Sequence, residues 1–141
     1  EEKELGATCV SLDELLKESD FVSLHPNMTD ETHHMIGERE FNLMKPTAYI
    51  INTARGPVID EKAMVRALQA GKIAGAGLDV FEREPFIEPE LLKMDNVVVA
   101  PHLGSAVTEV RDAMACVVVD NIEATLAGKP MPNCVNADVY K

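Results

Sequence analysis

Residues 47–56, Thr-Ala-Tyr-Ile-Ile-Asn-Thr-Ala-Arg-Gly, are the stretch that most constrains what this chain can fold into. A short run of β-forming residues, Tyr49 to Ile51, gives way abruptly to polar residues from Asn52 onward. This pattern is typical of a buried parallel strand that ends in a loop. Because ligands of open α/β sheets bind beyond the carboxyl ends of the strands, we expect Arg55 to lie at a ligand site.

Other short apolar runs predict strands at residues 7–10, 21–24, 73–80 and 97–99. The four clearest strands end at His25, Asn52, Asp79 and Ala100, and each of these ends carries or adjoins a polar group. Strands that alternate with helices indicate an α/β fold with a parallel sheet. In such a sheet all four ends lie on one edge, so four distant positions of the sequence should converge there.

Apolar residues at helical spacing predict helices over residues 12–18, 38–44, 61–70 and 105–127. Ser11 and Glu14 fit a capping box at the start of the first helix, where Leu12, Leu15 and Leu16 would share one face. Asp60 is the expected cap of the third helix. Gly128 is expected to end the longest one.

Composition excludes several classes of function. The net charge of −11 argues against nucleic-acid binding. No apolar run approaches the roughly 18 residues that span a bilayer, and no secretory signal opens the chain. The three cysteines are odd in number and form no C-x-x-C pair, which is typical of free thiols in a reducing cytosol. A cytoplasmic protein without membrane contact is therefore expected.

His33 and His34 are the one pair that suggests a metal site. Adjacent residues of a helix point about 100° apart. No carboxylate or cysteine completes a ligand set at the usual spacing. We therefore expect no metal.

Arg55, Glu84 and His102 each follow a predicted strand, so they should share one edge of the sheet. A guanidinium binds a carboxylate through two parallel hydrogen bonds, and histidine exchanges protons near neutral pH. The set suits the reduction of a 2-oxo acid, with arginine anchoring the substrate, histidine protonating the new alkoxide and glutamate orienting the histidine. No side chain supplies a hydride, so a nicotinamide cofactor is implied.

Each of these residues also has a simpler structural interpretation. Arg55 could pair with Asp60 or Asp79, Glu84 could be a solvated loop charge, and His102 could be a hydrogen-bonded histidine of the core. Their shared position on one edge favours chemistry over three unrelated structural roles.

Four motifs resemble the D-isomer-specific 2-hydroxyacid dehydrogenases in order and spacing. They are Asn52-Thr53-Ala54-Arg55-Gly56, Gly75-Ala76-Gly77-Leu78-Asp79-Val80, Glu84-Pro85 and Pro101-His102-Leu103-Gly104-Ser105-Ala106. The resemblance runs from about Leu5 to Pro132 and is closest to the glyoxylate/hydroxypyruvate reductase and phosphoglycerate dehydrogenase branches. It implies a Rossmann-type fold, a small 2-oxo acid substrate, NAD or NADP as the cofactor, and a homodimer.

The resemblance also implies roles for individual residues. Arg55, Glu84 and His102 match the catalytic residues of the family. The implied cofactor-binding residues are His25, Thr53, Ala54, Arg55, Asp79, His102, Leu103 and Gly104. The family often has His-x-Pro where Pro26 directly follows His25 in this chain.

No G-x-G-x-x-G occurs in the sequence. The family carries it upstream, where backbone N–H groups hold the pyrophosphate of the cofactor. We therefore interpret residues 1–104 as the C-terminal half of the cofactor-binding domain, without the glycine-rich loop, and residues 105–141 as a helix and tail of the substrate domain. On this interpretation the 141 residues alone should have little or no activity and should bind NADH weakly or not at all.

Two other classes of function share parts of this pattern. The corepressors known as C-terminal binding proteins have the same fold and the same three residues, and they would make the chain a dinucleotide-sensing binding module. A flavodoxin-like interaction domain would share the alternation of strands and helices, but it gives no reason for Arg, Glu and His at the strand ends. Turnover of glyoxylate by the full-length protein would distinguish the enzyme from both.

Overall fold

The computed structural model describes residues 2–140 of the chain. They form two compact units, divided between His102 and Leu103. The first unit contains a four-stranded sheet with its helices, and the second contains one long helix and the C-terminal residues. The sequence put the division after residue 104, and the assignment of the second unit to a substrate domain stays a prediction.

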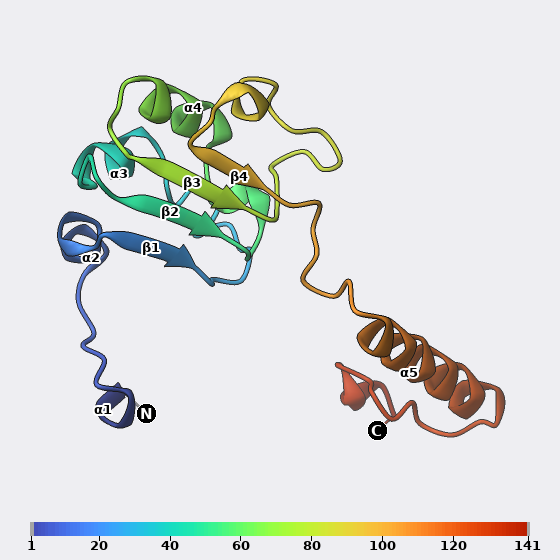
Figure 1. Ribbon diagram of the computed structural model, residues 1–141. Coiled ribbons are helices and arrows are strands. Elements are labelled where there is room, and N and C mark those ends of the chain that lie inside the picture. Colours follow the sequence, from blue (N-terminus) through green and yellow to red (C-terminus); the bar gives the residue numbers. More distant parts are fainter. Residues whose placement is uncertain (1, 141) are drawn as a thin grey trace. The chain divides into compact units, whose positions relative to one another are not determined.

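The sheet is built from four short parallel strands (Figure 1). They are β1 (Phe21–Leu24), β2 (Tyr49–Asn52), β3 (Gly75–Leu78) and β4 (Val97–Val99), which lie side by side in the order β1-β2-β3-β4. In the register of the sheet, Leu24 is opposite Asn52, and Asn52 is opposite Leu78. The predicted α/β fold with a parallel sheet is therefore confirmed.

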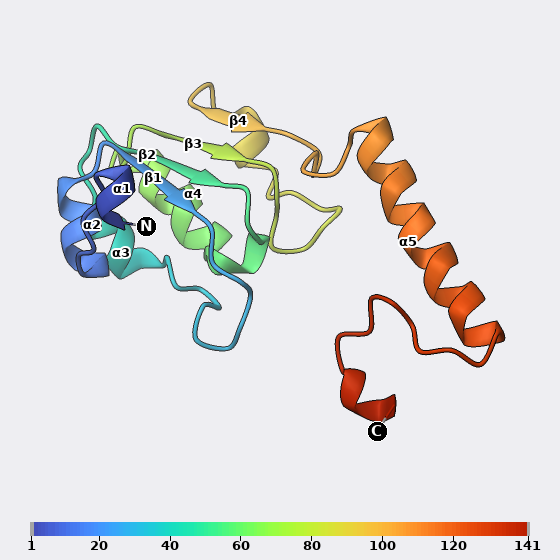
Figure 2. The same cartoon turned by 90° about the horizontal axis from the view of Figure 1, so that it is seen from below.

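The helices α2 (Leu12–Glu18), α3 (Glu38–Leu43) and α4 (Glu61–Gln69) lie on one face of this sheet (Figure 2). The first unit also contains a short α1 (Glu2–Leu5) near the N-terminus and two 3₁₀ turns, η1 (Gly56–Val58) and η2 (Leu91–Lys93). The predicted caps form: the Glu14 N–H donates to Ser11 Oγ at 3.3 Å, and the Ala63 N–H donates to Asp60 Oδ1 at 2.9 Å.

The core lies between these helices and the inner face of the sheet. Val22, Leu24, Ile50 and Leu78 point inward from the strands, and Phe41, Met64 and Leu68 meet them from α3 and α4. Because side chains of a strand alternate between faces, the residues between these, such as Phe21, Ser23, Tyr49 and Ile51, point to the opposite side.

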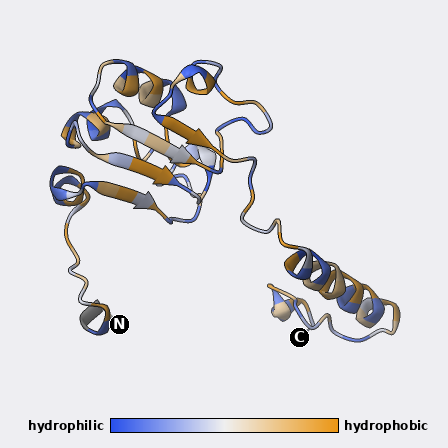
Figure 3. Ribbon diagram, viewed as in Figure 1, coloured by the Kyte–Doolittle hydropathy of each residue, from blue (hydrophilic) through white to orange (hydrophobic). Residues whose placement is uncertain are grey.

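The opposite face of the sheet carries exposed apolar side chains, and β4 is hydrophobic along its whole length (Figure 3). The rings of Phe21 and Tyr49 stack there, with centroids 5.6 Å apart. Gly75 is the next residue in that row of the register, and a Cβ added to it would lie 2.8 Å from the Tyr49 ring. Only glycine therefore lets the Tyr49 ring lie this close to β3.

The second unit consists of α5 (Thr108–Leu126) and a short 3₁₀ turn, η3 (Ala137–Tyr140). The residue after the helix cap, Gly128, has a φ of 67°, as expected for a glycine that ends a helix. Apolar side chains are exposed along α5, among them Val110, Met114, Val118 and Ile122. Within residues 2–140, no helix combines the length and the apolar character needed to cross a membrane.

One expectation for the N-terminal residues is wrong. Residues 7–10 form no strand: they are exposed and pair with no strand of the sheet. A four-residue run has no stability as a strand without a neighbouring strand and a face to bury. In α2, Leu16 is fully buried, whereas Leu12 and Leu15 are 36% and 38% exposed.

Candidate active site

The edge of the sheet where the strands end holds an open hollow of about 460 Å³. It is lined by residues that follow β1 and β2: His25, Pro26, Asn27, Met28, Thr53, Ala54 and Arg55. Four of the predicted cofactor-binding residues, His25, Thr53, Ala54 and Arg55, therefore lie around one cavity. The imidazole of His25 is held by Ser23 of β1, with 2.8 Å between His25 Nε2 and Ser23 Oγ.

Asn52, the last residue of β2, fixes the turn that carries Arg55. It is 1% exposed, and its side chain forms hydrogen bonds with the backbone both as a donor and as an acceptor. Asn52 Nδ2 donates to the Arg55 carbonyl oxygen at 2.9 Å, and the Ala54 N–H donates to Asn52 Oδ1 at 3.0 Å. A buried amide that satisfies both its donor and its acceptor in this way rigidifies the loop, so Asn52 positions Arg55 at the sheet edge.

Glu84 and His102, which are 18 residues apart in the sequence, are in contact. The distance from Glu84 Oε2 to His102 Nδ1 is 2.8 Å. The other carboxylate oxygen, Oε1, accepts a hydrogen bond of 3.1 Å from the Phe81 N–H. With Nδ1 turned to an acid, the Nε2 of the imidazole is the nitrogen left to exchange a proton with a ligand.

His102 has two further properties of a functional residue. Its side chain is 48% exposed, so the alternative of a core histidine is wrong. Its φ of 55° lies in the left-handed region, which is uncommon for residues other than glycine. Backbone conformations of this kind cluster at active sites and ligand clamps.

The charge of Arg55 also acts on Glu84. The pKa of the Glu84 carboxyl lies below its usual range, chiefly because His102 hydrogen-bonds to it, with smaller contributions from the Phe81 N–H and from the positive charge of Arg55. Arg55 itself donates from Nη1 to the Ala54 carbonyl at 2.6 Å. The roles assigned to Arg55, Glu84 and His102 stay predictions, and the geometry is compatible with them.

The remaining predicted cofactor-binding residues are Asp79, Leu103 and Gly104. Asp79 follows β3 and is half-buried, and its N–H donates to the Asn52 carbonyl at 3.0 Å, beside the turn that carries Arg55. Leu103 and Gly104 belong to the second unit, so their contact with a cofactor stays a prediction.

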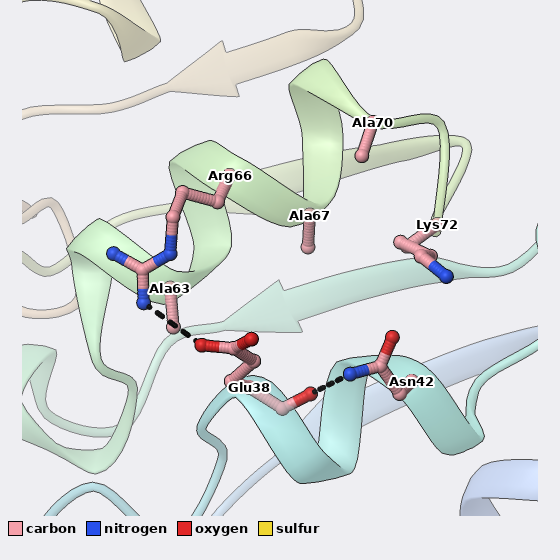
Figure 4. A pocket seen from close by; sticks show the side chains of 7 residues that line it. All are labelled: Glu38, Asn42, Ala63, Arg66, Ala67, Ala70 and Lys72. Atoms are coloured by element: carbon pink, nitrogen blue, oxygen red, sulfur yellow. Dashed lines mark hydrogen bonds and ion pairs between the residues drawn. The ribbon is translucent and has the colours of Figure 1, made fainter.

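A second hollow lies between α3 and α4 (Figure 4). It measures about 120 Å³ and is bordered by an ion pair between Arg66 and Glu38, with 3.4 Å between Nη2 and Oε2. Lys72, at its far end, precedes β3, so this hollow reaches toward the amino ends of the strands. Because α/β sheets bind ligands at the carboxyl ends, and because small-molecule pockets usually exceed about 300 Å³, we do not assign a site here.

The histidine pair forms no recognisable metal centre. The rings of His33 and His34 stack with centroids 4.0 Å apart. Among residues 2–140, no three His, Cys, Asp or Glu side chains gather in an arrangement that could hold a metal ion. His34 instead pairs with Glu82, with 3.1 Å between His34 Nε2 and Glu82 Oε1.

Sequence reasoning missed the residues that hold the loops together. Glu61 is 4% exposed, and its Oε1 accepts a hydrogen bond from the Glu82 N–H. Gly56 packs directly against the backbone of Phe81 and Glu82. A glutamate is ordinarily solvated, so no local pattern marks Glu61 as buried.

The residues around the larger hollow fit one end of a nicotinamide dinucleotide. Its volume is within the range of small-molecule sites. Thr53, His25 and Arg55 provide a hydroxyl, an imidazole and a guanidinium, which suit ribose hydroxyls and negative charge. The sequence holds no G-x-G-x-x-G.

Known proteins resemble this chain along nearly its whole length. Residues 1–104 match the family model described as D-isomer specific 2-hydroxyacid dehydrogenase, NAD binding domain. A glyoxylate reductase from Thermococcus litoralis is 56% identical over 138 residues, which are 98% of this chain and 42% of that protein.

Solved structures give the same result. The crystal structure of a glyoxylate reductase from Paecilomyes thermophila matches with a TM-score of 0.84 and 43% identity, covering 97% of this chain and 42% of that one. An NADPH-dependent glyoxylate/hydroxypyruvate reductase from Sinorhizobium meliloti, in complex with NADP and malonate, matches with a TM-score of 0.83 and 36% identity, covering 90% and 40%. The chain spans less than half the length of each of these relatives.

Proposed function

The chain belongs to the D-isomer specific 2-hydroxyacid dehydrogenase family, in its NAD-binding domain, and on this premise we propose that the whole protein reduces a small 2-oxo acid to the corresponding 2-hydroxy acid. Glyoxylate and hydroxypyruvate are the proposed substrates, because relatives carry these names. The cofactor is proposed as NAD or NADP without a choice, since the family description names NAD and the Sinorhizobium meliloti complex contains NADP.

The observation that carries this proposal is the contact between Glu84 and His102. An acid that accepts a hydrogen bond from Nδ1–H fixes the tautomer and the direction of the imidazole. In the reduction, His102 would then donate a proton from Nε2 to the oxygen of the substrate carbonyl. In the reverse reaction the same nitrogen would take the proton back from the hydroxyl.

Arg55 is proposed to bind the substrate. Its guanidinium can hold the carboxylate of a 2-oxo acid through two parallel hydrogen bonds and can draw electron density from the neighbouring ketone. The turn built around Asn52 would hold it in place during this step. A nicotinamide cofactor, when bound, supplies the hydride that no side chain can provide.

We further propose that the whole protein is a homodimer, as the family resemblance implies. The apolar side chains exposed along α5 support an interface with another chain or domain. Light scattering after size-exclusion chromatography would test this, and a monomeric mass at micromolar concentration would contradict it.

The decisive experiment is a turnover assay on the whole protein with glyoxylate or hydroxypyruvate and either NADH or NADPH. In that assay, His102→Ala should lower kcat by roughly 10²–10⁴, the usual contribution of a general acid. His33→Ala is a suitable control, because His33 is also an exposed histidine but lies outside the proposed site.

Two results would contradict the proposal. A kcat of His102→Ala within twofold of the unmodified protein would exclude the role of His102. Binding of a nicotinamide cofactor without turnover of any 2-oxo acid would instead favour a dinucleotide-sensing module of the corepressor type.

A further inference from the structure

Glu61 is a buried acid that the proposed reaction does not use. It is the first residue of α4, and it is one of two buried polar residues in the part of the chain that the structure describes, together with Asn52. Burying a carboxylate costs free energy unless its oxygens are hydrogen-bonded. The partners of Glu61 are therefore informative about what it does.

Glu61 and Glu82 hold each other through their backbones. Glu61 Oε1 accepts a hydrogen bond from the Glu82 N–H, and Glu82 Oε2 accepts one of 3.3 Å from the Glu61 N–H. The second of these bonds places a carboxylate at the N-terminus of α4, where negative charge is stabilised. His34 anchors the remaining oxygen of Glu82 at 3.1 Å.

Glu61 shares this region with two other acids. Burial and the nearby charges of Glu82 and Glu88 raise the pKa of Glu61, whereas the hydrogen bond from the Glu82 N–H opposes that change. Beyond Glu82 the chain turns back on itself, with a bridge between Arg83 and Phe86. Glu84 lies within this turn, so Glu61 holds the backbone of the loop just before the residue that contacts His102.

The amide that Glu61 binds is next to the amide that binds Glu84. The Phe81 N–H donates to Glu84 Oε1, and the next amide along the chain, that of Glu82, donates to Glu61. Glu84 Oε2 is thereby left for His102. A shift of the backbone at Glu82 would carry the Phe81 N–H with it and would turn the Glu84 carboxylate away from the imidazole.

We propose that Glu61 is a positioning residue for the pair Glu84 and His102, acting by clamping the backbone of the loop at residue 82. The effect on turnover rests on the proposed function, whereas the positioning of Glu84 and His102 by Glu61 does not. The clamp needs a hydrogen-bond acceptor at Oε1 rather than a negative charge. Glutamine should therefore replace Glu61, whereas alanine should not.

The test measures the titration of Glu84 by carbon-13 NMR of labelled glutamate carboxyl groups, alongside kcat and KM of the whole protein. In Glu61→Ala the pKa of Glu84 should rise toward the ordinary value of a glutamate, and kcat should fall about tenfold or more with little change in KM. In Glu61→Gln both quantities should stay near those of the unmodified protein. Glu38→Ala is the matched control, because Glu38 is also the first residue of a helix, α3, but is exposed.

Because Glu61→Ala could unfold the chain, Glu61→Asp serves as a milder variant that shortens the reach of the carboxylate by one methylene. It should raise the pKa of Glu84 in the same direction. A Glu84 titration that is unchanged in a folded Glu61→Ala or Glu61→Asp would overturn the proposal. Absence of turnover in the unmodified protein would count against the proposed function instead, and the NMR titration would still decide the clamp.

Discussion

Gly56 faces the peptide group of Phe81 so closely that an added Cβ would lie 1.9 Å from both the carbonyl carbon and the carbonyl oxygen. The two residues come from different loops of the same sheet edge: Gly56 follows Arg55, and Phe81 precedes Glu84. Two loops that carry proposed catalytic groups therefore touch through their backbones. The contact fixes the distance between the loops, since neither backbone can yield as a side chain can.

Gly56→Ala should consequently destabilise the chain strongly. No rotamer change relieves a clash with backbone atoms, so we expect a loss in unfolding free energy of about 3 kcal/mol, the upper end of the range for overpacking. Urea unfolding followed by circular dichroism measures it. Gly37→Ala is the control, because the nearest atom to its added Cβ lies at an ordinary 3.5 Å. Equal losses of unfolding free energy in the two variants would show that the close contact between Gly56 and Phe81 is not the cause of the destabilisation.

Asn52→Ala should loosen the turn that carries Arg55. The variant leaves the Ala54 N–H and the Arg55 carbonyl without their buried partner, which costs about 1–3 kcal/mol of stability. Because the turn positions a substrate-binding group, KM for the 2-oxo acid should rise as well. Asn42→Ala removes an exposed asparagine that bonds the Glu38 carbonyl and should change neither quantity appreciably. An unaltered KM in Asn52→Ala would show that the turn does not contribute to substrate binding.

Glu84→Gln should change how stability depends on pH. The pKa of Glu84 is lowered in the folded chain, chiefly by His102, so the ionised form stabilises the fold. This contribution is fully present above the ordinary pKa of a glutamate and is lost as the pH falls through the lowered value. The difference in unfolding free energy between the unmodified chain and Glu84→Gln should therefore be largest at neutral pH and should shrink in acid.

Chemical denaturation at several pH values between neutrality and about pH 3 measures this difference, because the window is set by the carboxyl group. Glu90→Gln offers the comparison, since Glu90 is an exposed glutamate near the same loop. If the two variants show the same dependence on pH, the contact with His102 contributes nothing to stability.

Arg55→Lys should impair the whole protein severely although the charge is kept. An ammonium group cannot form the forked contact of a guanidinium with a carboxylate, so kcat/KM for the 2-oxo acid should fall by about 10²-fold or more. Arg66→Lys, on the exposed side of α4, is the matched substitution and should leave kcat/KM unchanged. Full activity of Arg55→Lys would mean that Arg55 acts only through its charge.

The four strands of the sheet and the members of the proposed site followed from local patterns in the sequence. Tyr49 to Asn52 form a strand where the β-forming run predicted one, and Asp60 caps α4 as its position suggested. The meeting of Glu84 with His102 was predictable because parallel strands bring their ends to one edge.

What the sequence could not show depends on contacts between distant segments. The burial of Glu61 arises from the loop around Glu82, 21 residues away, and both residues have the composition of a solvated surface. The predicted strand at residues 7–10 failed for the converse reason, because its local preference for β structure found no partner strand. Local propensity predicts elements well and pairings poorly when the pairing partner is far along the chain.

Each of the two units contains one tyrosine, Tyr49 in β2 and Tyr140 in η3, and the sequence has two tyrosines and no tryptophan. The tyrosine fluorescence of this chain therefore comes from one residue in each unit. Tyr140→Phe would leave an optical signal from the sheet alone, and Tyr49→Phe would leave one from the helical unit alone. The melting of the two units can thus be followed separately, without attaching any dye.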